Sequence, residues 1–310
     1  MFIYRKVTNN LTRRKWQIYV IFERYTNKLD MTLERKVDFA IKLLRSIPTN
    51  DGPIELSYSG GKDSDVILEL ARMSGIPFEA IYKNTTIDPP GTITHCKEQG
   101  VTILKPRMTF LQLVEKKGTP SRFSRFCCEV LKEYKVYNRA IQGIRRSEST
   151  KRAQRYNEPE ICRVYSSKEK VRVYLPVLEW TDEDVARFIE ERGIKCAPHY
   201  YDADGTFHVE RRLGCIGCPL ASGNGREDFK KYPKLLKAII EAKKRFYAAD
   251  PNRGKSFGGD VYKSMFYQFF CENLEDYSIK IGGGYIPGIS NRREAILIRV
   301  FRNRTINTIL

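Results

Sequence analysis

The chain has 310 residues, of which 41% are hydrophobic and 30% charged, and its formal net charge is +18. This length and apolar content allow one large core domain with extensions. No segment approaches the roughly 18 apolar residues that a membrane span needs, and the N-terminus lacks the apolar core of a signal peptide. We therefore expect a cytoplasmic protein without a membrane partner. The positive charge favours a polyanionic partner such as nucleic acid or a phosphorylated substrate, although a solvated basic surface is the plain alternative.

The first 48 residues are basic and predict a helical N-terminal extension. Segment 33–47, "LERKVDFAIKLLRSI", has apolar residues at helical spacing, and Pro48 follows it. We expect this helix to pack on the main domain.

From residue 53, short apolar segments alternate with helical ones. Strands are predicted within 54–58, 77–84, 101–106, 139–144 and 171–177, and helices within 65–75, 109–118 and 181–193. In the last helix Thr181 can cap the first turn together with Asp184, and Gly193 ends the pattern. This alternation predicts an α/β fold with a doubly wound, mainly parallel sheet.

After about residue 224 the character of the chain changes again. Segment 226–250 predicts a helix that is broken or begins at Pro233, and the remainder is aromatic, basic and glycine-punctuated. We therefore predict a helical extension at 1–48, a core domain at 49–224 and a helical basic C-terminal region at 225–310.

A glycine-rich loop, "SGGKDS" at 59–64, lies between the first predicted strand and its helix. Backbone N–H groups of such a turn and the helix N-terminus can bind a phosphate. Gly60 and Gly61 let the backbone approach it, and Lys62 supplies a cation. Asp63 would orient the loop or hold Mg²⁺. The plain alternative is a glycine turn with a helix cap, and the pattern is not a Walker loop. The hydroxyls of the loop come from Ser59 and Ser64.

This loop resembles the PP-loop of the N-type ATP pyrophosphatases. The resemblance implies an adenine nucleotide α-hydrolase-like sheet. It also implies that the loop grips the pyrophosphate of ATP while a nucleophile is adenylated at the α-phosphorus.

Further segments resemble the phosphoadenylyl-sulfate (PAPS) and adenylyl-sulfate (APS) reductase family, over about residues 53–222. "NTTIDPPGTITH" at 84–95 is similar to the part of that family that borders the nucleoside, and "LPVLEWTDEDVARFIEERG" at 175–193 resembles its P-L-x-x-W-T segment. "GIRRSESTKR" at 143–152 is similar to its G-x-R-x-x-x-S-x-x-R segment, whose arginines face the phosphate or sulfate end. The planar fork of arginine suits either anion, although two adjacent arginines can also be a solvated charge pair.

The resemblance gives this set of site residues. The predicted catalytic residues are Lys62, Asp63 and Arg145. The predicted nucleotide-binding residues are Ser59, Gly60, Gly61, Lys62, Asp63, Ser64, Thr85, Thr86, Asp88, Gly143, Arg145, Ser149 and Arg152.

Four of the eight cysteines form two pairs. Cys127 and Cys128 are adjacent, which is poor geometry for a disulfide between them, and Cys215 and Cys218 form a C-x-x-C motif. Four thiolates suit either Zn²⁺ or a [4Fe–4S] cluster, although C-x-x-C also occurs in redox sites and plain turns. The order of the two pairs resembles the cluster-bearing adenylyl-sulfate reductases and implies one [4Fe–4S] cluster next to the nucleotide. The arginines expected to offset its charge are Arg122, Arg125, Arg211 and Arg212.

The other cysteines and the histidines show no ligand spacing. We expect Cys96, Cys162, Cys196 and Cys271 to be core residues. We expect His95, His199 and His208 to serve packing or hydrogen bonding.

Two departures from the reductases affect the predicted activity. Those enzymes attack sulfur with a cysteine in a C-terminal E-C-G-x-H motif, whereas this chain ends in "FRNRTINTIL" and its last cysteine is Cys271. The intact Lys62–Asp63 pair is more typical of an ATP user. We therefore predict an ATP pyrophosphatase or adenylating sulfur-transfer enzyme acting on a nucleic acid or another acceptor, similar to DNA phosphorothioation sulfurtransferases and tRNA-thiolating enzymes. The alternatives are a PAPS or APS reductase that uses Cys271, and a non-catalytic module that binds a nucleotide and nucleic acid. The oligomeric state stays open.

Overall fold

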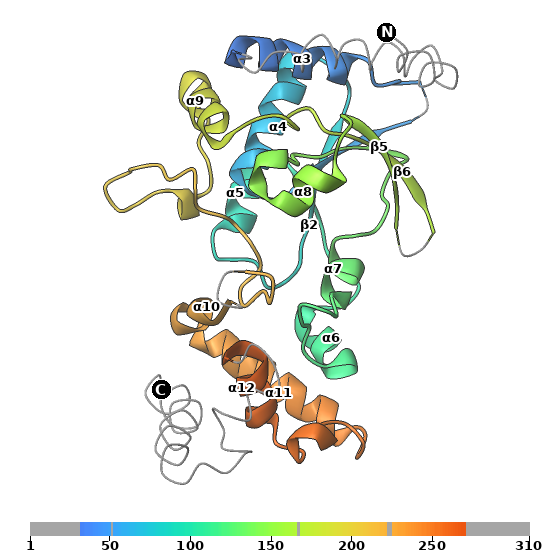
Figure 1. Cartoon of the computed structure of the whole chain (residues 1–310), viewed down its shortest axis with the longest axis vertical. Helices are drawn as coiled ribbons and strands as arrows, with labels where there is room; N and C mark the ends of the chain where they lie inside the picture. Colours follow the sequence, from blue (N-terminus) through green and yellow to red (C-terminus); the bar gives the residue numbers. More distant parts are fainter. Residues whose placement is uncertain (1–31, 51, 166–167, 222–224, 271–310) are drawn as a thin grey trace. The chain divides into compact units, whose positions relative to one another are not determined.

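The computed structural model describes residues 32–50, 52–165, 168–221 and 225–270 (Figure 1). These residues form two compact units. The first contains the chain up to Asn84, Pro90–Lys105 and Glu133–Leu213, and the second contains Thr85–Pro89, Pro106–Lys132 and the chain from Gly214 onward.

The first unit is built on a six-stranded sheet with the order β3-β2-β1-β4-β6-β5. The strands are β1 (Ile54–Tyr58), β2 (Glu79–Lys83), β3 (Thr102–Leu104), β4 (Arg139–Ile141), β5 (Glu160–Val164) and β6 (Lys170–Tyr174). All neighbouring pairs are parallel except β5 and β6, so β5 is an antiparallel edge strand. The predicted doubly wound, mainly parallel sheet is confirmed.

Both faces of this sheet carry an apolar core, because alternate residues of a strand point to opposite faces. Ile54, Leu56 and Tyr58 of β1 are buried in the first core. The helices that contribute to it are α3 (Leu33–Arg45), α4 (Lys62–Ser74) and α9 (Asp182–Arg192), of which α4 packs against the other two. Val171 and Val173 of β6 belong to a core on the other face.

The helix ends follow the expected capping chemistry. At α9, the Thr181 side chain accepts a hydrogen bond from the Asp184 backbone N–H, and Asp184 bonds back to the Thr181 N–H, which completes a capping box. Gly193 ends this helix and Gly75 ends α4, both with left-handed backbone angles that glycine adopts without a steric penalty. The described part of the unit also contains two short α-helices, α5 (Thr92–Glu98) and α8 (Thr150–Arg155).

The described part of the second unit is helical. Its helices are α6 (Phe110–Lys117), α7 (Phe126–Leu131), α10 (Arg226–Lys231), α11 (Pro233–Ala248) and α12 (Val261–Phe270). The predicted break at Pro233 is the junction of α10 and α11. Leu236, Ile239 and Ile240 are the buried face of α11, which packs against α6 and α12 (Figure 1). In the described part of the chain, no helix has the length and apolar composition to cross a membrane.

Candidate nucleotide site and cysteine pocket

The phosphate loop connects β1 to α4 in the first unit, and its glycines are required by close approach. A Cβ added to Gly60, whose φ is +78°, would lie 2.8 Å from Thr92 Cγ2. A Cβ added to Gly61 would lie 3.1 Å from the Tyr200 hydroxyl. Gly61 is the N-cap of α4, and no side chain of the described residues caps this end. The first amides of α4 can therefore face a phosphate group.

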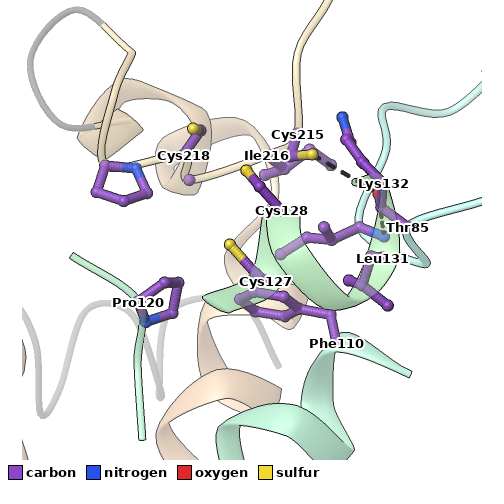
Figure 2. Close-up of a pocket in the computed structure, with 13 residues that line it drawn as sticks. Thr85, Phe110, Pro120, Cys127, Cys128, Leu131, Lys132, Cys215, Ile216 and Cys218 are labelled. Carbon is purple, nitrogen blue, oxygen red and sulfur yellow. Dashed lines mark hydrogen bonds between the residues drawn. The ribbon is translucent and has the colours of Figure 1, made fainter. Parts of the chain in front are cut away.

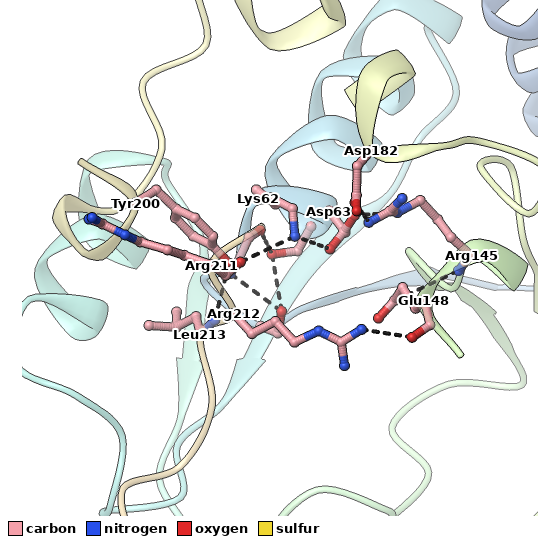
Figure 3. Close-up of polar contacts among 12 residues, drawn as sticks. Lys62, Asp63, Arg145, Glu148, Asp182, Tyr200, Arg211, Arg212 and Leu213 are labelled. Carbon is pink, nitrogen blue, oxygen red and sulfur yellow. Dashed lines mark hydrogen bonds and ion pairs between the residues drawn. The ribbon is translucent and has the colours of Figure 1, made fainter. Parts of the chain in front are cut away.

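Lys62, the first residue of α4, is only 4% exposed. Its Nζ lies 3.3 Å from Asp63 Oδ2 and 3.5 Å from the carbonyl oxygen of Arg211, and 5.6 Å from the centre of the Tyr200 ring (Figure 3). Tyr200 is itself fixed, since its hydroxyl accepts a hydrogen bond from the Leu213 N–H at 3.3 Å. The ammonium is therefore held at the loop rather than free in solvent.

Arg145 is 1% exposed and joins the phosphate loop to the start of α9. Its Nε donates to Asp63 Oδ1 at 2.7 Å and its Nη2 donates to Asp182 Oδ1 at 2.7 Å, while Nη1 donates to Ser147 Oγ at 3.0 Å (Figure 3). Burial disfavours the charge, but the Asp63 and Asp182 carboxylates outweigh it and raise the pKa of Arg145. The guanidinium is thus a fixed cation at the base of the loop.

The residues around Arg145 bring the predicted G-x-R-x-x-x-S-x-x-R segment to the same place. A Cβ added to Gly143 would lie 2.8 Å from the Asp63 carbonyl oxygen, so the segment approaches the loop backbone directly. Ser149 Oγ accepts from the Arg152 N–H at 3.2 Å and caps α8, and Arg152 forms an ion pair with Glu148. The Glu148 carbonyl accepts from Arg212 at 2.8 Å. Ser149 therefore also has a structural role as a helix cap.

A buried carboxylate lies beneath the loop, and the sequence analysis did not single it out. Asp65 accepts hydrogen bonds from the Tyr58 hydroxyl and lies 2.9 Å from His95 Nε2. Burial raises the pKa of Asp65 despite the opposing effect of His95. The prediction that His95 serves hydrogen bonding is confirmed. The position of Asp65, three residues after Lys62 on α4, was the only signal for it in the sequence.

The residues predicted to border the nucleoside lie in the second unit. Thr86 has a left-handed φ of +61°, which is unusual for a β-branched residue, and its Oγ1 accepts from the Phe110 N–H at 2.8 Å. Asp88 Oδ2 accepts from the Thr85 N–H at 3.1 Å. Thr85 Oγ1 and Asp88 Oδ1 each lie 3.7 Å from Cys215 Sγ. These residues thus contact the cysteine pocket, and their role toward a nucleoside stays a prediction.

All four paired cysteines line one pocket of the second unit (Figure 2). Helix α7 carries Cys127 and Cys128, and the turn after Leu213 carries Cys215 and Cys218. This turn depends on Gly217, whose φ is +68° and whose N–H donates to Asp228 Oδ2 at 2.9 Å. The apolar part of the lining comes from Ile87, Phe110, Pro120, Leu131, Ile216 and Pro219. The four thiols are free of disulfides.

Positive charge at this pocket comes from residues on or next to α7. Desolvation disfavours the ammonium of Lys132, but Cys215 and Asp88 raise its pKa overall. A hydrogen bond from Cys127, together with the nearby Arg125, lowers the pKa of Cys128. The sequence analysis missed Lys132, although its place four residues after Cys128 on a helix could have indicated it.

The other arginines expected to flank the cysteines have different partners. Arg122 Nε donates to the Pro219 carbonyl at 3.1 Å, on the wall of the pocket. Arg211 forms an ion pair with Asp202 in the first unit. In the described part of the chain, no three His, Cys, Asp or Glu side chains are grouped closely enough to hold a single metal ion.

The remaining cysteines and histidines divide into confirmed and corrected predictions. Cys96 and Cys196 are buried, as expected, whereas Cys162 is exposed because it lies on the edge strand β5 and points away from the core. Cys271 lies outside the described residues. His199 contacts the Tyr200 ring edge-on, as expected of a packing histidine, and His208 hydrogen-bonds two carboxylates.

The fold and this loop define a PP-loop type of nucleotide-binding α/β protein, and the comparison with known families is more specific. Residues 53–221, more than half of the chain, match the phosphoadenosine phosphosulfate reductase domain. The chain therefore belongs to this family.

Similarity to individual proteins is lower. The chain is 31% identical to an uncharacterized protein of Methanocaldococcus jannaschii over 62% of its own length and 48% of that protein. It is 28% identical to sulfate adenylyltransferase subunit 2 of Agrobacterium fabrum over 59% of its own length and 68% of that protein. It spans about half the length of the first of these relatives. The PAPS reductase of Candida auris is 15% identical, covers 55% of this chain and 92% of its own, and has a TM-score of 0.39, which adds nothing to the fold assignment above.

Proposed function

We propose that this chain binds ATP at the phosphate loop, releases pyrophosphate while an acceptor is adenylated, and takes part in transferring sulfur to that acceptor. The observation that carries this proposal is the complete "SGGKDS" loop with two buried cations at its base. Lys62 is 4% exposed and Arg145 is 1% exposed, and both contact Asp63. A site with fixed cations beside a helix N-terminus that no described side chain caps suits a leaving pyrophosphate, because its charge grows as the bond breaks.

In the adenylation step, an oxygen of the acceptor bonds to the α-phosphorus of ATP. The bond from that phosphorus to the bridging oxygen of the β-phosphate breaks, and pyrophosphate leaves with the bonding pair. Lys62 and the first amides of α4 would stabilise the leaving pyrophosphate. A nucleophile of the hydrosulfide class then bonds to the activated acceptor and displaces AMP. Arg145 would position the loop through Asp63, since its fork is already engaged by two carboxylates.

Asp63 is the proposed protein ligand for Mg²⁺ in this scheme, and the ion would supply positive charge for the leaving pyrophosphate. Its Oδ1 accepts from Arg145 and its Oδ2 lies 3.3 Å from Lys62. A carboxylate has further lone pairs, so these contacts leave room for a metal or a metal-bound water.

We further propose that Cys127, Cys128, Cys215 and Cys218 bind a [4Fe–4S] cluster. All four line the same pocket, and the positive charge of Lys132 lies beside it, which suits an anionic cluster of thiolate ligands. Zinc is the alternative occupant, since it too binds four thiolates, and it would require all four at about 2.3 Å from one centre. When bound, a cluster would supply a redox-active, sulfur-containing centre.

The nucleotide used separates this proposal from the second candidate, a PAPS or APS reductase, which the family match favours. The full chain is incubated with ATP, PAPS or APS and reduced thioredoxin, and pyrophosphate and sulfite are measured. We expect pyrophosphate from ATP and no sulfite. Sulfite that disappears in Cys271→Ser, but not in the control Cys162→Ser, would establish the reductase instead.

Iron and acid-labile sulfide analysis of anaerobically purified protein, with its absorption spectrum, tests the cluster. We expect about four irons per chain and a loss of iron in Cys128→Ser and Cys218→Ser. Cys162→Ser is the control, because that thiol is exposed on β5. One zinc per chain without iron would overturn this part of the proposal.

A further inference from the structure

A second hollow in the second unit lies at the junction of α10 and α11. It has a volume of about 420 Å³ and is lined by Ile216, Lys231, Tyr232, Pro233, Lys234 and Leu235. This volume is within the range of small-ligand sites. Ile216 also lines the cysteine pocket, so one residue forms a wall of both. Apart from Ile216, the lining lies beyond the segment that matches the family.

The lysines at this hollow differ from other cations of the same helices. Lys231, Lys234 and the next exposed lysine, Lys237, have no ion pair or side-chain hydrogen bond with any described residue, and all three are exposed. By contrast, Lys230 pairs with Glu227 at 2.7 Å and Lys244 pairs with Glu241 at 2.7 Å. The cations around the hollow are therefore available to an anion from outside the described chain.

An aromatic side chain, Tyr232, also lines the hollow. Tyr232 is half-buried and packs on the core of the second unit, so its ring is held in place. It is the N-cap of the 16-residue helix α11, whose first turn is not capped by a side chain of the described residues. A fixed tyrosine between two lysines combines a stacking surface with phosphate-binding groups, which is the pattern of single-strand nucleic acid sites.

We propose that this hollow binds one nucleotide of a single-stranded nucleic acid, with Lys231 and Lys234 on flanking phosphates and the base against Tyr232. The proposal rests on the proposed function and makes it more specific, since it names the acceptor class and the place where the acceptor is held next to the cysteine pocket. A hollow of this size admits an unstacked nucleotide but not a base within a duplex.

Binding of fluorescein-labelled 12-nucleotide single strands, one DNA and one RNA of mixed sequence, is measured by fluorescence anisotropy with the full chain at several salt concentrations. The test variant is Lys231→Ala/Lys234→Ala. Its matched control is Lys230→Ala/Lys244→Ala, which removes two paired lysines from the same helices. We expect the test variant to bind roughly tenfold more weakly, with a salt slope of log K smaller by about 1.4, because each phosphate contact to a single strand contributes about 0.7.

Tyr232→Leu keeps an apolar side chain for the core and removes the stacking surface. We expect its affinity to fall by a factor of about 5 to 100, with the same thermal midpoint as the wild type. The probe that binds more tightly shows whether the natural strand is DNA or RNA. A labelled duplex of the same sequence is expected to bind more weakly than the single strands.

Hydrolysis of ATP to AMP and pyrophosphate, with water as the acceptor and no nucleic acid present, keeps this inference separate from the proposed function. None of the three variants is expected to change it. The inference is overturned if the wild type binds neither strand, if the test and control variants bind equally, or if only a protein acceptor is bound, and each of these outcomes leaves the ATP reaction intact. Failure of ATP turnover with normal strand binding would instead count against the proposed function alone.

Discussion

The phosphate loop and the cysteine pocket differ in how their reactive groups are held. At the loop, Lys62, Asp63 and Arg145 contact one another or fixed neighbours at 2.7 to 3.3 Å. At the pocket, the contacts of Cys215 with Thr85 and Asp88 are both 3.7 Å long, and much of the lining is apolar. The groups at the loop are thus fixed by short contacts between charged side chains, whereas the pocket gathers four sulfurs among largely apolar neighbours.

The two units also differ in the partners that they provide for a buried cationic side chain. Arg145 in the first unit has two carboxylate partners, while Lys243 of α11 in the second unit has one hydrogen-bond partner among the described residues, the Thr119 hydroxyl at 2.9 Å. A change at the loop should therefore damage activity through lost geometry. A change at Lys243 should mainly alter stability.

The largest effect is expected for Gly143→Ala. The added Cβ would lie 2.8 Å from the Asp63 carbonyl oxygen. This atom belongs to the backbone, so it cannot move out of the way as the end of a flexible side chain can. We expect pyrophosphate release from ATP to fall about 100-fold, the size of effect that an ångström of misplacement produces. Gly214→Ala is the control, since its Cβ would meet nothing within 4 Å. Equal activity in the two variants would show that the loop is not preorganised by this contact.

Arg145→Lys tests the hydrogen bonds that the guanidinium donates to two carboxylates at once. A lysine cannot reach Asp63 and Asp182 together, so one carboxylate loses its partner. We expect a fall in pyrophosphate release of about tenfold or more and a loss of about 3 kcal/mol in the free energy of unfolding. The matched Arg146→Lys removes a half-exposed guanidinium paired with Glu179 and is expected to change little. A wild-type denaturation midpoint for Arg145→Lys would contradict the structural role of the fork.

Lys243→Met sharpens the contrast between the two buried cations. Burial lowers the pKa of Lys243 to about 7, so the unfolded chain binds more protons between pH 7 and the usual lysine pKa near 10.5. The free energy of unfolding should therefore rise with pH across that range in the wild type. We expect methionine to stabilise the protein by about 1 to 3 kcal/mol at pH 7 and below, with the gain vanishing near pH 10.5. Urea unfolding at several pH values measures it, and a gain that does not depend on pH would contradict the assignment.

The smallest effect is expected at the loop that follows α9 in the first unit. His208 lies 2.6 Å from Asp202 and 2.9 Å from Glu210, and these hydrogen bonds raise its pKa. The neighbouring Arg211 opposes the charge on the ring but also pairs with Asp202. Since the folded pKa is raised, the contribution to stability is present at low pH and is lost as the pH rises through the folded pKa. An NMR titration of the imidazole should give a pKa above 6.5 in the wild type and a lower one in Asp202→Asn, and identical values in both would refute the contact.

The first unit was largely predictable because its signals are local. The phosphate loop, the Thr181 cap and the glycine ends of α4 and α9 each require a particular residue type at a particular position. The antiparallel strand β5 was not predicted, because "EICRV" is an edge strand whose alternation includes charged residues.

The site was less predictable where it depends on tertiary contacts. Nothing local indicates that Asp182 would share the Arg145 fork, or that the Tyr200 hydroxyl would lie at the loop. The predicted burial of Cys162 was wrong. The residue lies on β5, and the sequence did not indicate that this edge strand exists. The four cysteines were predicted from their pairing, and the structure places them in one pocket, but a thiol pattern does not specify the group it binds.

In the proposed function, the chemistry begins with ATP at the phosphate loop. It is tested most directly by pyrophosphate release from ATP in Lys62→Ala, compared with Lys42→Ala, an exposed lysine of α3 paired with Asp38. We expect a loss of at least about 100-fold in Lys62→Ala and wild-type release in Lys42→Ala. Undiminished release in Lys62→Ala would contradict the proposed function.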